Sequence, residues 1–131
     1  MTILIDTSFL VALASPKDSN HAQARQLIDA TQEELVIPAP VLPELFDMVA
    51  IRVNYSSAIR VFDYLQSSYQ IEALTVEDRA RMSAIMKQYL SARFDFVDTA
   101  IMALAERLTI TRVFTFDHRD FVIFRPAHCP I

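Results

Sequence analysis

The most constraining feature of this sequence is the complete absence of glycine from its 131 residues. A domain of this length would ordinarily contain about nine glycines, at the usual ~7%. Glycine adopts left-handed backbone conformations without a steric penalty, and phosphate-binding loops built on glycine depend on that freedom. The dinucleotide turn GxGxxG, the loop GxxxxGK[ST] and the nucleophile elbow GxSxG are therefore excluded. If such a chain handles phosphate, it must do so with side chains, helix ends or a metal ion.

Short apolar segments alternate with amphipathic ones along the chain, which predicts an α/β fold. We expect strands at 2–5, 35–37, 69–74 and 112–116, with 121–124 as a candidate fifth strand. We expect helices at 8–14, 20–30, 76–90 and 96–108, and the helix at 76–90 should turn Ala80, Ile85 and Tyr89 inward. A further helix is expected from Pro43 to about Arg52, and another after a cap at Ser56 or Ser57. Strands separated by helices favour a mostly parallel sheet of four to five strands in a three-layer α/β/α sandwich. The length and the 53% hydrophobic content predict a single domain spanning 1–131.

Carboxylates follow the expected strands at positions that suggest a site. Asp6 ends the first strand and Asp117 ends the fourth, and ligands of open α/β sheets bind outside the carboxyl ends of strands. Glu44 lies in the first turn after Pro43, and Asp98 lies near the start of the apolar helix. Four acids in one crevice repel one another unless they are protonated or bridged by a cation. Hard oxygen ligands without a histidine or cysteine set suit Mg²⁺ or Mn²⁺.

Each of these acids also has a purely structural interpretation. Asp6 can cap the following helix, and Glu44 can complement a helix dipole in a first turn. Asp98 can belong to a capping arrangement whose N-cap is Asp95. Asp117 can form an Asx turn after its strand. No acid is diagnostic alone, so the metal-site prediction depends on all four occurring together.

The four acidic segments resemble the motifs of the PIN domain. The segment Ile3–Ser8 resembles the opening strand and its Asp, and Pro43-Glu44-Leu45 resembles the second motif. The third motif is matched by 96–108, and the fourth by Thr115-Phe116-Asp117 with the trailing Asp120-Phe121. The resemblance covers essentially the whole chain, and 95–121 is most similar to the VapC toxins of toxin–antitoxin pairs. One departure is Thr109, where relatives commonly place glycine; a left-handed conformation there would strain a β-branched residue.

The resemblance implies a metal-dependent endoribonuclease that cleaves RNA phosphodiester bonds and acts as a toxin sequestered by an antitoxin protein. In such an enzyme Asp6, Glu44, Asp98 and Asp117 would form the catalytic, metal-binding set for Mg²⁺ or Mn²⁺. Hydroxyl groups can orient metal-binding carboxylates or a water, and the candidates for that role are Thr7, Ser8 and Thr115. Asp95 is expected chiefly as a helix N-cap beside the site, with a supporting role there. Two alternatives remain open: a degenerate PIN fold acting as an inactive scaffold, and a Mg-dependent phosphatase of haloacid-dehalogenase type, which would require a D-x-D motif where the chain has Asp6-Thr7-Ser8.

The net charge of −4 does not by itself indicate RNA binding. We therefore expect Arg93 and Arg119 to flank the metal site and to bind substrate phosphates. The resemblance also implies a homodimer, and apolar surface on the helices between Pro43 and Leu65 could serve that dimer or a partner helix. A single cysteine, Cys129, fits a reducing compartment, and no apolar run is long enough to span a bilayer. We accordingly expect a cytoplasmic protein with no membrane association.

Overall fold

The computed structural model describes residues 1–128, so Cys129 lies outside the described part of the chain. Its sheet has four parallel strands in the order β3-β2-β1-β4. The strands are β1 (Thr2–Ile5), β2 (Glu34–Pro38), β3 (Gln70–Glu72) and β4 (Val113–Phe114). The candidate fifth strand was wrong, because this segment forms the short helix α7 (Arg119–Ile123). Phe121 and Phe124 pack into the hydrophobic core from that helix.

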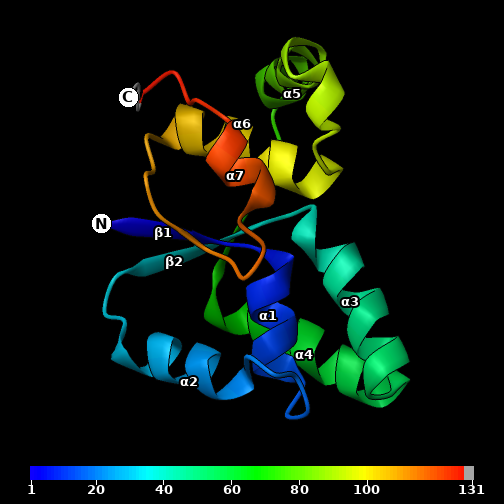
Figure 1. Cartoon of the computed structure of the whole chain (residues 1–131). Coiled ribbons are helices and arrows are strands. Elements are labelled where there is room, and N and C mark those ends of the chain that lie inside the picture. Colours follow the sequence, from blue (N-terminus) through cyan, green and yellow to red (C-terminus); the bar gives the residue numbers. More distant parts are fainter. Residues whose placement is uncertain (129–131) are drawn as a thin grey trace.

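Helices cover both faces of the sheet, which confirms the expected three-layer α/β/α sandwich (Figure 1). One layer contains α1 (Thr7–Ala14), α2 (His21–Ala30), α3 (Val41–Arg52) and α4 (Tyr55–Ser68). The other contains α5 (Val76–Gln88), the 3₁₀ turn η1 (Leu90–Ala92), α6 (Phe96–Leu108) and α7. None of the helices described is long and apolar enough to cross a membrane.

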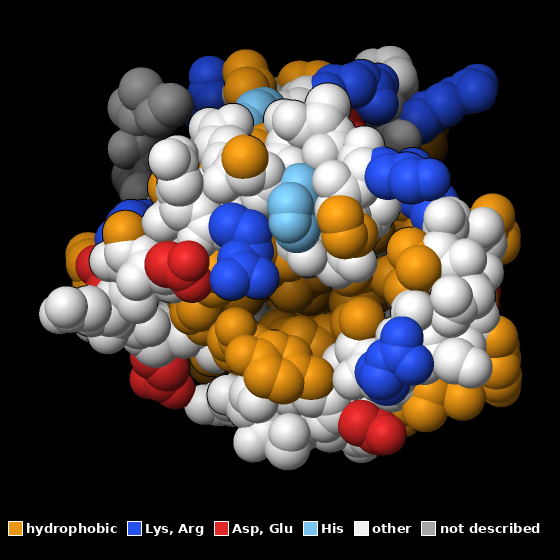
Figure 2. All heavy atoms as spheres, turned by 90° about the horizontal axis from the view of Figure 1, so that it is seen from below, with side chains coloured by type: hydrophobic (Ala, Val, Ile, Leu, Met, Phe, Trp, Pro, Cys, Tyr) orange, Lys and Arg blue, Asp and Glu red, His pale blue; other side chains and the backbone are white. Residues whose placement is uncertain are grey.

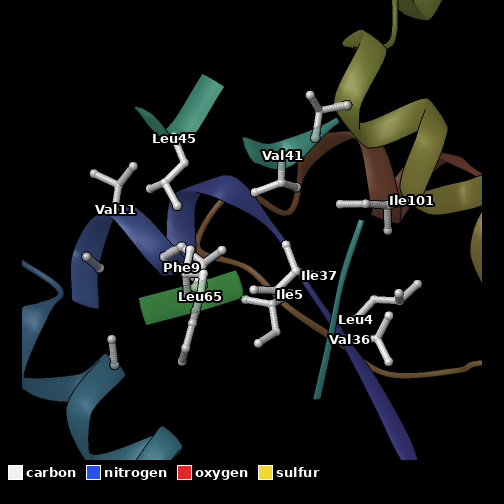
Figure 3. Close-up of a cluster of buried hydrophobic side chains, with 14 of the residues drawn as sticks. Leu4, Ile5, Phe9, Val11, Val36, Ile37, Val41, Leu45, Leu65 and Ile101 are labelled. Atoms are coloured by element: carbon white, nitrogen blue, oxygen red, sulfur yellow. The ribbon is translucent and has the colours of Figure 1, made fainter. Parts of the chain in front are cut away.

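Strand β1 is the centre of the fold. Ile3, Leu4 and Ile5 are completely buried, as expected for a parallel strand with helices on both faces. In Figure 3 the side chains of β1 and β2 meet those of Phe9 from α1, with Val41 and Leu45 from α3 nearby. The chain extends the sheet to one side of β1 with β2 and β3, and then returns to the other side with β4. This reversal creates a topological switch point at the carboxyl ends of β1 and β4, where ligands of such sheets bind.

Two details of the helices differ from expectation. The N-cap of α4 is Asn54, whose side chain accepts a hydrogen bond from the Ser57 amide at 2.7 Å, so neither Ser56 nor Ser57 is the cap. In α5, Ala80 is exposed rather than inward, and Asp78 and Met82 are buried instead. An acid therefore occupies part of the buried face of α5, which hydrophobic periodicity alone does not predict.

Ion pairs attach α5 to α6. The guanidinium of Arg81 donates to both carboxylate oxygens of Glu106, at 2.6 and 3.0 Å. Arg107 donates through Nε to Asp78 Oδ1 at 2.9 Å and through Nη2 to Glu72 at 3.0 Å. Burial acts to raise the pKa of Asp78, but hydrogen bonds from Arg107 and Thr75 outweigh it and lower that pKa below its usual value. The pKa of Glu106 is lowered by its hydrogen bond to Arg81, against a smaller effect of burial.

Thr109 ends α6 in the left-handed conformation, with φ 54°. Its amide and that of Ile110 donate to the carbonyls of Glu106 and Ala105, which closes the helix as glycine usually does. The position thus has a conformation that favours glycine but carries a β-branched side chain. A non-glycine residue in this conformation is strained by roughly 1–2 kcal/mol.

Candidate active site

The candidate site begins with Asp6, at the point where β1 becomes α1. Asp6 is the N-cap of α1, and its Oδ1 accepts a hydrogen bond from the Thr7 amide at 2.7 Å. The carboxyl is only 4% exposed, because the strand and helix that flank it are both in the core. The capping interpretation is therefore correct, and the same residue also faces the switch point.

Two hydroxyl groups hold the second oxygen of Asp6. Thr115 Oγ1 donates to Asp6 Oδ2 at 2.7 Å, and Ser8 Oγ lies 3.4 Å from the same oxygen. Ser8 Oγ in turn accepts the Phe116 amide at 2.9 Å, which ties the segment after β4 to the start of α1. The Thr7 hydroxyl is buried and has no hydrogen-bond partner within residues 1–128, so Thr7 contacts Asp6 through its backbone alone. Ser8 and Thr115 thus contact the Asp6 carboxylate with their hydroxyl groups, and the role predicted for them there stays a prediction.

The start of α6 supplies the next pair of acids. Asp95 is the N-cap, and its Oδ2 accepts hydrogen bonds from the Val97 amide at 3.1 Å and the Asp98 amide at 3.4 Å. Asp98 lies one turn into the helix and is 6% exposed. The helix therefore uses Asp95 to complete its own first turn and presents Asp98 toward the switch point.

Asp120, and not Asp117, is the acid that the last segment buries against Asp98. Asp120 is 3% exposed in the first turn of α7, whereas Asp117 is exposed. The amide of Asp95 donates to Asp120 Oδ2 at 3.1 Å, and the carboxyls of Asp98 and Asp120 are hydrogen-bonded to each other. In the sequence, Asp120 stands out only as a residue that trails the fourth motif. If residues 119–123 had been interpreted as a helix, Asp120 would have been placed inside that helix and Asp117 in the loop before it.

The two arginines expected beside the site differ in their contacts. Arg119 donates through Nη1 to Asp120 Oδ1 at 3.2 Å and through Nη2 to the carbonyl of Ala92 at 2.7 Å. Arg93 is exposed directly after η1, in a left-handed conformation with φ 52°. Arg119 is therefore bonded to a member of the acid cluster, whereas Arg93 is an exposed residue two positions before Asp95.

Negative charge dominates the electrostatics of this cluster. Burial raises the pKa of Asp6, the charge of Glu44 adds to that rise, and hydrogen bonds from Thr115 and Thr7 oppose it. Burial, the hydrogen bond with Asp120 and the charge of Asp6 raise the pKa of Asp98 to about 9. Asp98 is therefore protonated at neutral pH. This is the expected result when several carboxylates share one buried site.

The donor chemistry of the cluster fits a hard divalent cation. Within residues 1–128, no three acid, histidine or cysteine side chains form a ready-made metal cluster, so the acids would have to close around an ion as it binds. The acids that influence one another are Asp6, Glu44, Asp95, Asp98 and Asp120, all with oxygen donors. A bound cation would replace the proton that Asp98 carries, because it stabilises the ionised carboxylates. Oxygen-only donors of this kind suit Mg²⁺ or Mn²⁺.

The most prominent pocket lies elsewhere, between α1, α2 and α4. This groove of about 620 Å³ has an apolar floor that includes Leu13, Ile28 and Val61, with Arg25 and Arg60 also lining it. Figure 2 shows a hollow with hydrophobic side chains at its base and basic side chains beside it. The groove contains none of the clustered acids, so it is separate from the candidate site at the switch point.

Comparison with known proteins identifies the family. A sequence profile of the PIN domain matches residues 3–124. Ribonuclease VapC26 of Mycobacterium tuberculosis (strain ATCC 25618 / H37Rv) is 28% identical over 125 residues, which cover 95% of this chain and 93% of that protein. The crystal structure of M. tuberculosis VapC20, described as a Sarcin-Ricin loop cleaving toxin, gives a TM-score of 0.85 at 21% identity, covering 93% of this chain and 95% of that one. VapBC2 from Rickettsia felis, bound to a DNA fragment from its promoter, gives 0.73 at 15% identity, with 99% and 96% covered. The match over nearly the whole chain and the acids gathered at the switch point lead to one conclusion: this chain belongs to the PIN domain family.

Proposed function

We propose that this protein is a metal-dependent endoribonuclease and the toxin of a toxin–antitoxin pair. The observation that carries the proposal is the set of buried acids at the switch point of a PIN domain, where burial and the neighbouring acids keep Asp98 protonated. The similarity to ribonuclease VapC26 over 95% of the chain supports the assignment of RNA as the substrate. The toxin role is supported by the fold shared with the VapC20 toxin and with VapBC2.

We assign Asp6, Glu44, Asp98 and Asp120 to hold Mg²⁺ or Mn²⁺, with Asp120 in the place that the sequence suggested for Asp117. When bound, such an ion supplies an activated water and stabilises the charge that develops on the phosphodiester. The protein orients its own ligands: Thr115 and Ser8 fix the Asp6 carboxylate. The Asp95 amide likewise fixes one oxygen of Asp120. Mutation of orienting partners of this kind commonly lowers metal affinity or activity by 10–100-fold.

The RNA phosphates would be bound at the edge of the acid cluster. Arg93 and Arg119 are exposed there, and the planar guanidinium matches phosphate geometry in two hydrogen bonds. Bound cations also change the sign of the local potential, so the metal would contribute to substrate attraction despite the net charge of −4.

The decisive experiment is cleavage of a structured RNA by the purified protein with Mn²⁺ or Mg²⁺. We expect cleavage that EDTA abolishes and that Asp6→Asn reduces at least about 100-fold. Asp47→Asn is the matched control, because Asp47 is an exposed acid on α3. Undiminished cleavage by Asp6→Asn would contradict the proposal. Hydrolysis of p-nitrophenyl phosphate without RNA cleavage would indicate a phosphatase, and RNA binding without cleavage would indicate a scaffold.

The groove between α1, α2 and α4 is the surface we assign to the antitoxin. Its apolar floor and its two arginines match a partner segment that combines apolar and acidic residues. Val61→Glu places a charge on that floor. We expect it to abolish inhibition by the cognate antitoxin while RNA cleavage continues. Inhibition that remains complete would place the antitoxin on another surface.

We also propose that the protein forms a homodimer through the junction of α3 and α4. Large apolar side chains are exposed there, namely Ile51, Val53, Tyr55 and Ile59. Exposed apolar residues gathered on one surface are typical of association sites. Light scattering after size exclusion should give twice the 14.9 kDa chain mass for the wild type and a monomer for Ile51→Glu. A dimer that tolerates this substitution would have its interface elsewhere.

A further inference from the structure

Arg119 bridges two segments across the edge of the acid cluster. It is the first residue of α7, and its guanidinium reaches back to η1 by donating to the Ala92 carbonyl at 2.7 Å. The other terminal nitrogen donates to Asp120 Oδ1 at 3.2 Å. One side chain therefore links α7, η1 and a carboxylate of the candidate metal site.

Both oxygens of Asp120 accept hydrogen bonds, one of them from Arg119. Oδ1 accepts from Arg119, and Oδ2 accepts from the amide of Asp95. Within residues 1–128, Arg119 is also the basic side chain that forms an ion pair with one of the clustered acids. The other ion pairs in this part of the chain involve acids outside the cluster, namely Asp18, Glu33, Glu72, Asp78 and Glu106. Arg119 is thus the internal counter-charge of this acid cluster.

The two partners of this ion pair have very different access to water. The Arg119 side chain is 63% exposed, whereas that of Asp120 is 5% exposed. An ion pair with one exposed partner contributes little to stability and is easily opened from the solvent side. Asp120 is held by its position in α7, but the guanidinium can leave without disturbing the core.

We propose that Arg119 is a positioning residue that competes with the divalent cation for the Asp120 carboxylate, so that cation binding releases its guanidinium for the RNA phosphate. This inference rests on the proposed function, because it requires the metal site. A metal ion bound to the Asp120 carboxylate would repel the guanidinium at Oδ1, since both are positive and lie against the same group. Once displaced, Arg119 presents a planar fork of donors suited to phosphate at the edge of the site.

The test is the affinity for Mn²⁺ alone, measured by isothermal titration calorimetry without RNA in 0.3 M KCl, which screens distant charges. We expect Arg119→Ala to bind Mn²⁺ about 2- to 5-fold more tightly than the wild type, as befits removal of an exposed ion pair. Arg119→Gln, which keeps a donor for the Ala92 carbonyl, should show the same tightening. It covers the case in which the alanine variant is poorly folded.

Arg93→Ala is the matched control, because it removes the same charge from the neighbouring exposed turn. We expect its affinity for Mn²⁺ to equal that of the wild type. Weaker binding by both Arg119 variants would show that Arg119 merely supports Asp120 and would overturn the inference. Equal tightening in Arg93→Ala would overturn it as well, since the effect would then be one of general charge. No Mn²⁺ binding by the wild-type protein would instead contradict the proposed metal site itself.

Discussion

Replacing Asp98 by asparagine should stabilise the metal-free protein at neutral pH, although it removes a residue that we assign to the active site. Burial, the hydrogen bond with Asp120 and the neighbouring acidic charges raise the pKa of Asp98 to about 9. In the unfolded chain the same carboxyl ionises near its ordinary pKa of about 3.9. Folding at pH 7 therefore requires Asp98 to take up a proton. Asparagine has nearly the same shape and requires none.

The sign and size of the effect follow from proton linkage. Below about pH 4 the Asp98 carboxyl is protonated in both the folded and the unfolded state, so it does not change the free energy of unfolding. As pH rises, the carboxyl destabilises the folded state more and more, and this effect levels off near the folded-state pKa of about 9. Each pH unit in that range lowers the free energy of unfolding by about 1.4 kcal/mol, which sets an upper limit of about 4 kcal/mol at pH 7. Relaxation of the neighbouring acids makes the effect smaller than this limit. We therefore expect Asp98→Asn to raise the free energy of unfolding by about 2 kcal/mol and the Tm by several degrees.

The assay is thermal unfolding followed by circular dichroism at pH 4, 5.5 and 7, in EDTA. The gain of Asp98→Asn should be near zero at pH 4 and increase with pH, while Asp47→Asn, the exposed control, should show no such trend. Adding Mn²⁺ should reverse the order at pH 7, because an ion that binds only the native state raises the Tm of the wild type. A gain that is the same at pH 4 and pH 7, or a loss at pH 7, would refute the assignment of Asp98 as the proton-bearing acid.

Three further predictions follow from the site and the helix ends. Asp120→Asn should reduce metal-dependent RNA cleavage at least about 10-fold more than Asp117→Asn, because Asp120 is buried against the other acids; equal losses would return Asp117 to the metal set. Thr109→Gly should raise the free energy of unfolding by about 0.5–1 kcal/mol in urea titrations, since it relieves left-handed strain at the end of α6, and a destabilised variant would mean that no strain is present. Asp78→Asn should lower the free energy of unfolding by about 2 kcal/mol at pH 7, because Asp78 is bound by Arg107 and forms the capping box of α5 with Thr75. Its pKa is lowered, so that stabilisation is present above pH ~4 and is lost as pH falls through the folded-state pKa; a cost that persists at pH 2.5 would contradict this origin.

Much of the fold could be predicted because local pattern and tertiary packing agree over most of the chain. The helix at Phe96–Leu108 has the bounds that its continuous apolar stretch indicates. The start of β1 and its end at Asp6 follow from a β-branched run that stops at a favoured N-cap. The parallel arrangement then follows from the alternation of strands and helices, and it predicted that Asp6 and Asp98 lie close together, as the charge of Asp6 acting on Asp98 indicates.

The errors arose where tertiary contacts override the local pattern. The segment 119–123 contains β-branched and aromatic residues, which favour a strand, but Phe121 and Phe124 pack on the core from a helical turn. The helix buries Asp120 against Asp98 and leaves Asp117 exposed. In α5 the buried face includes Asp78, whose charge is paired with Arg107, 29 positions further along the chain. Sequence periodicity contains no information about such a distant partner.

The link between Asp6 and Thr115 joins residues 109 positions apart, and Asp120 lies still closer to the end of the chain. During synthesis the ribosome makes Asp6 well before α7. A nascent chain therefore carries β1 and its carboxylate long before the segments that complete the acid cluster exist. The acid cluster therefore assembles only after β4 and α7 have been made, which ties formation of the site to completion of the sheet.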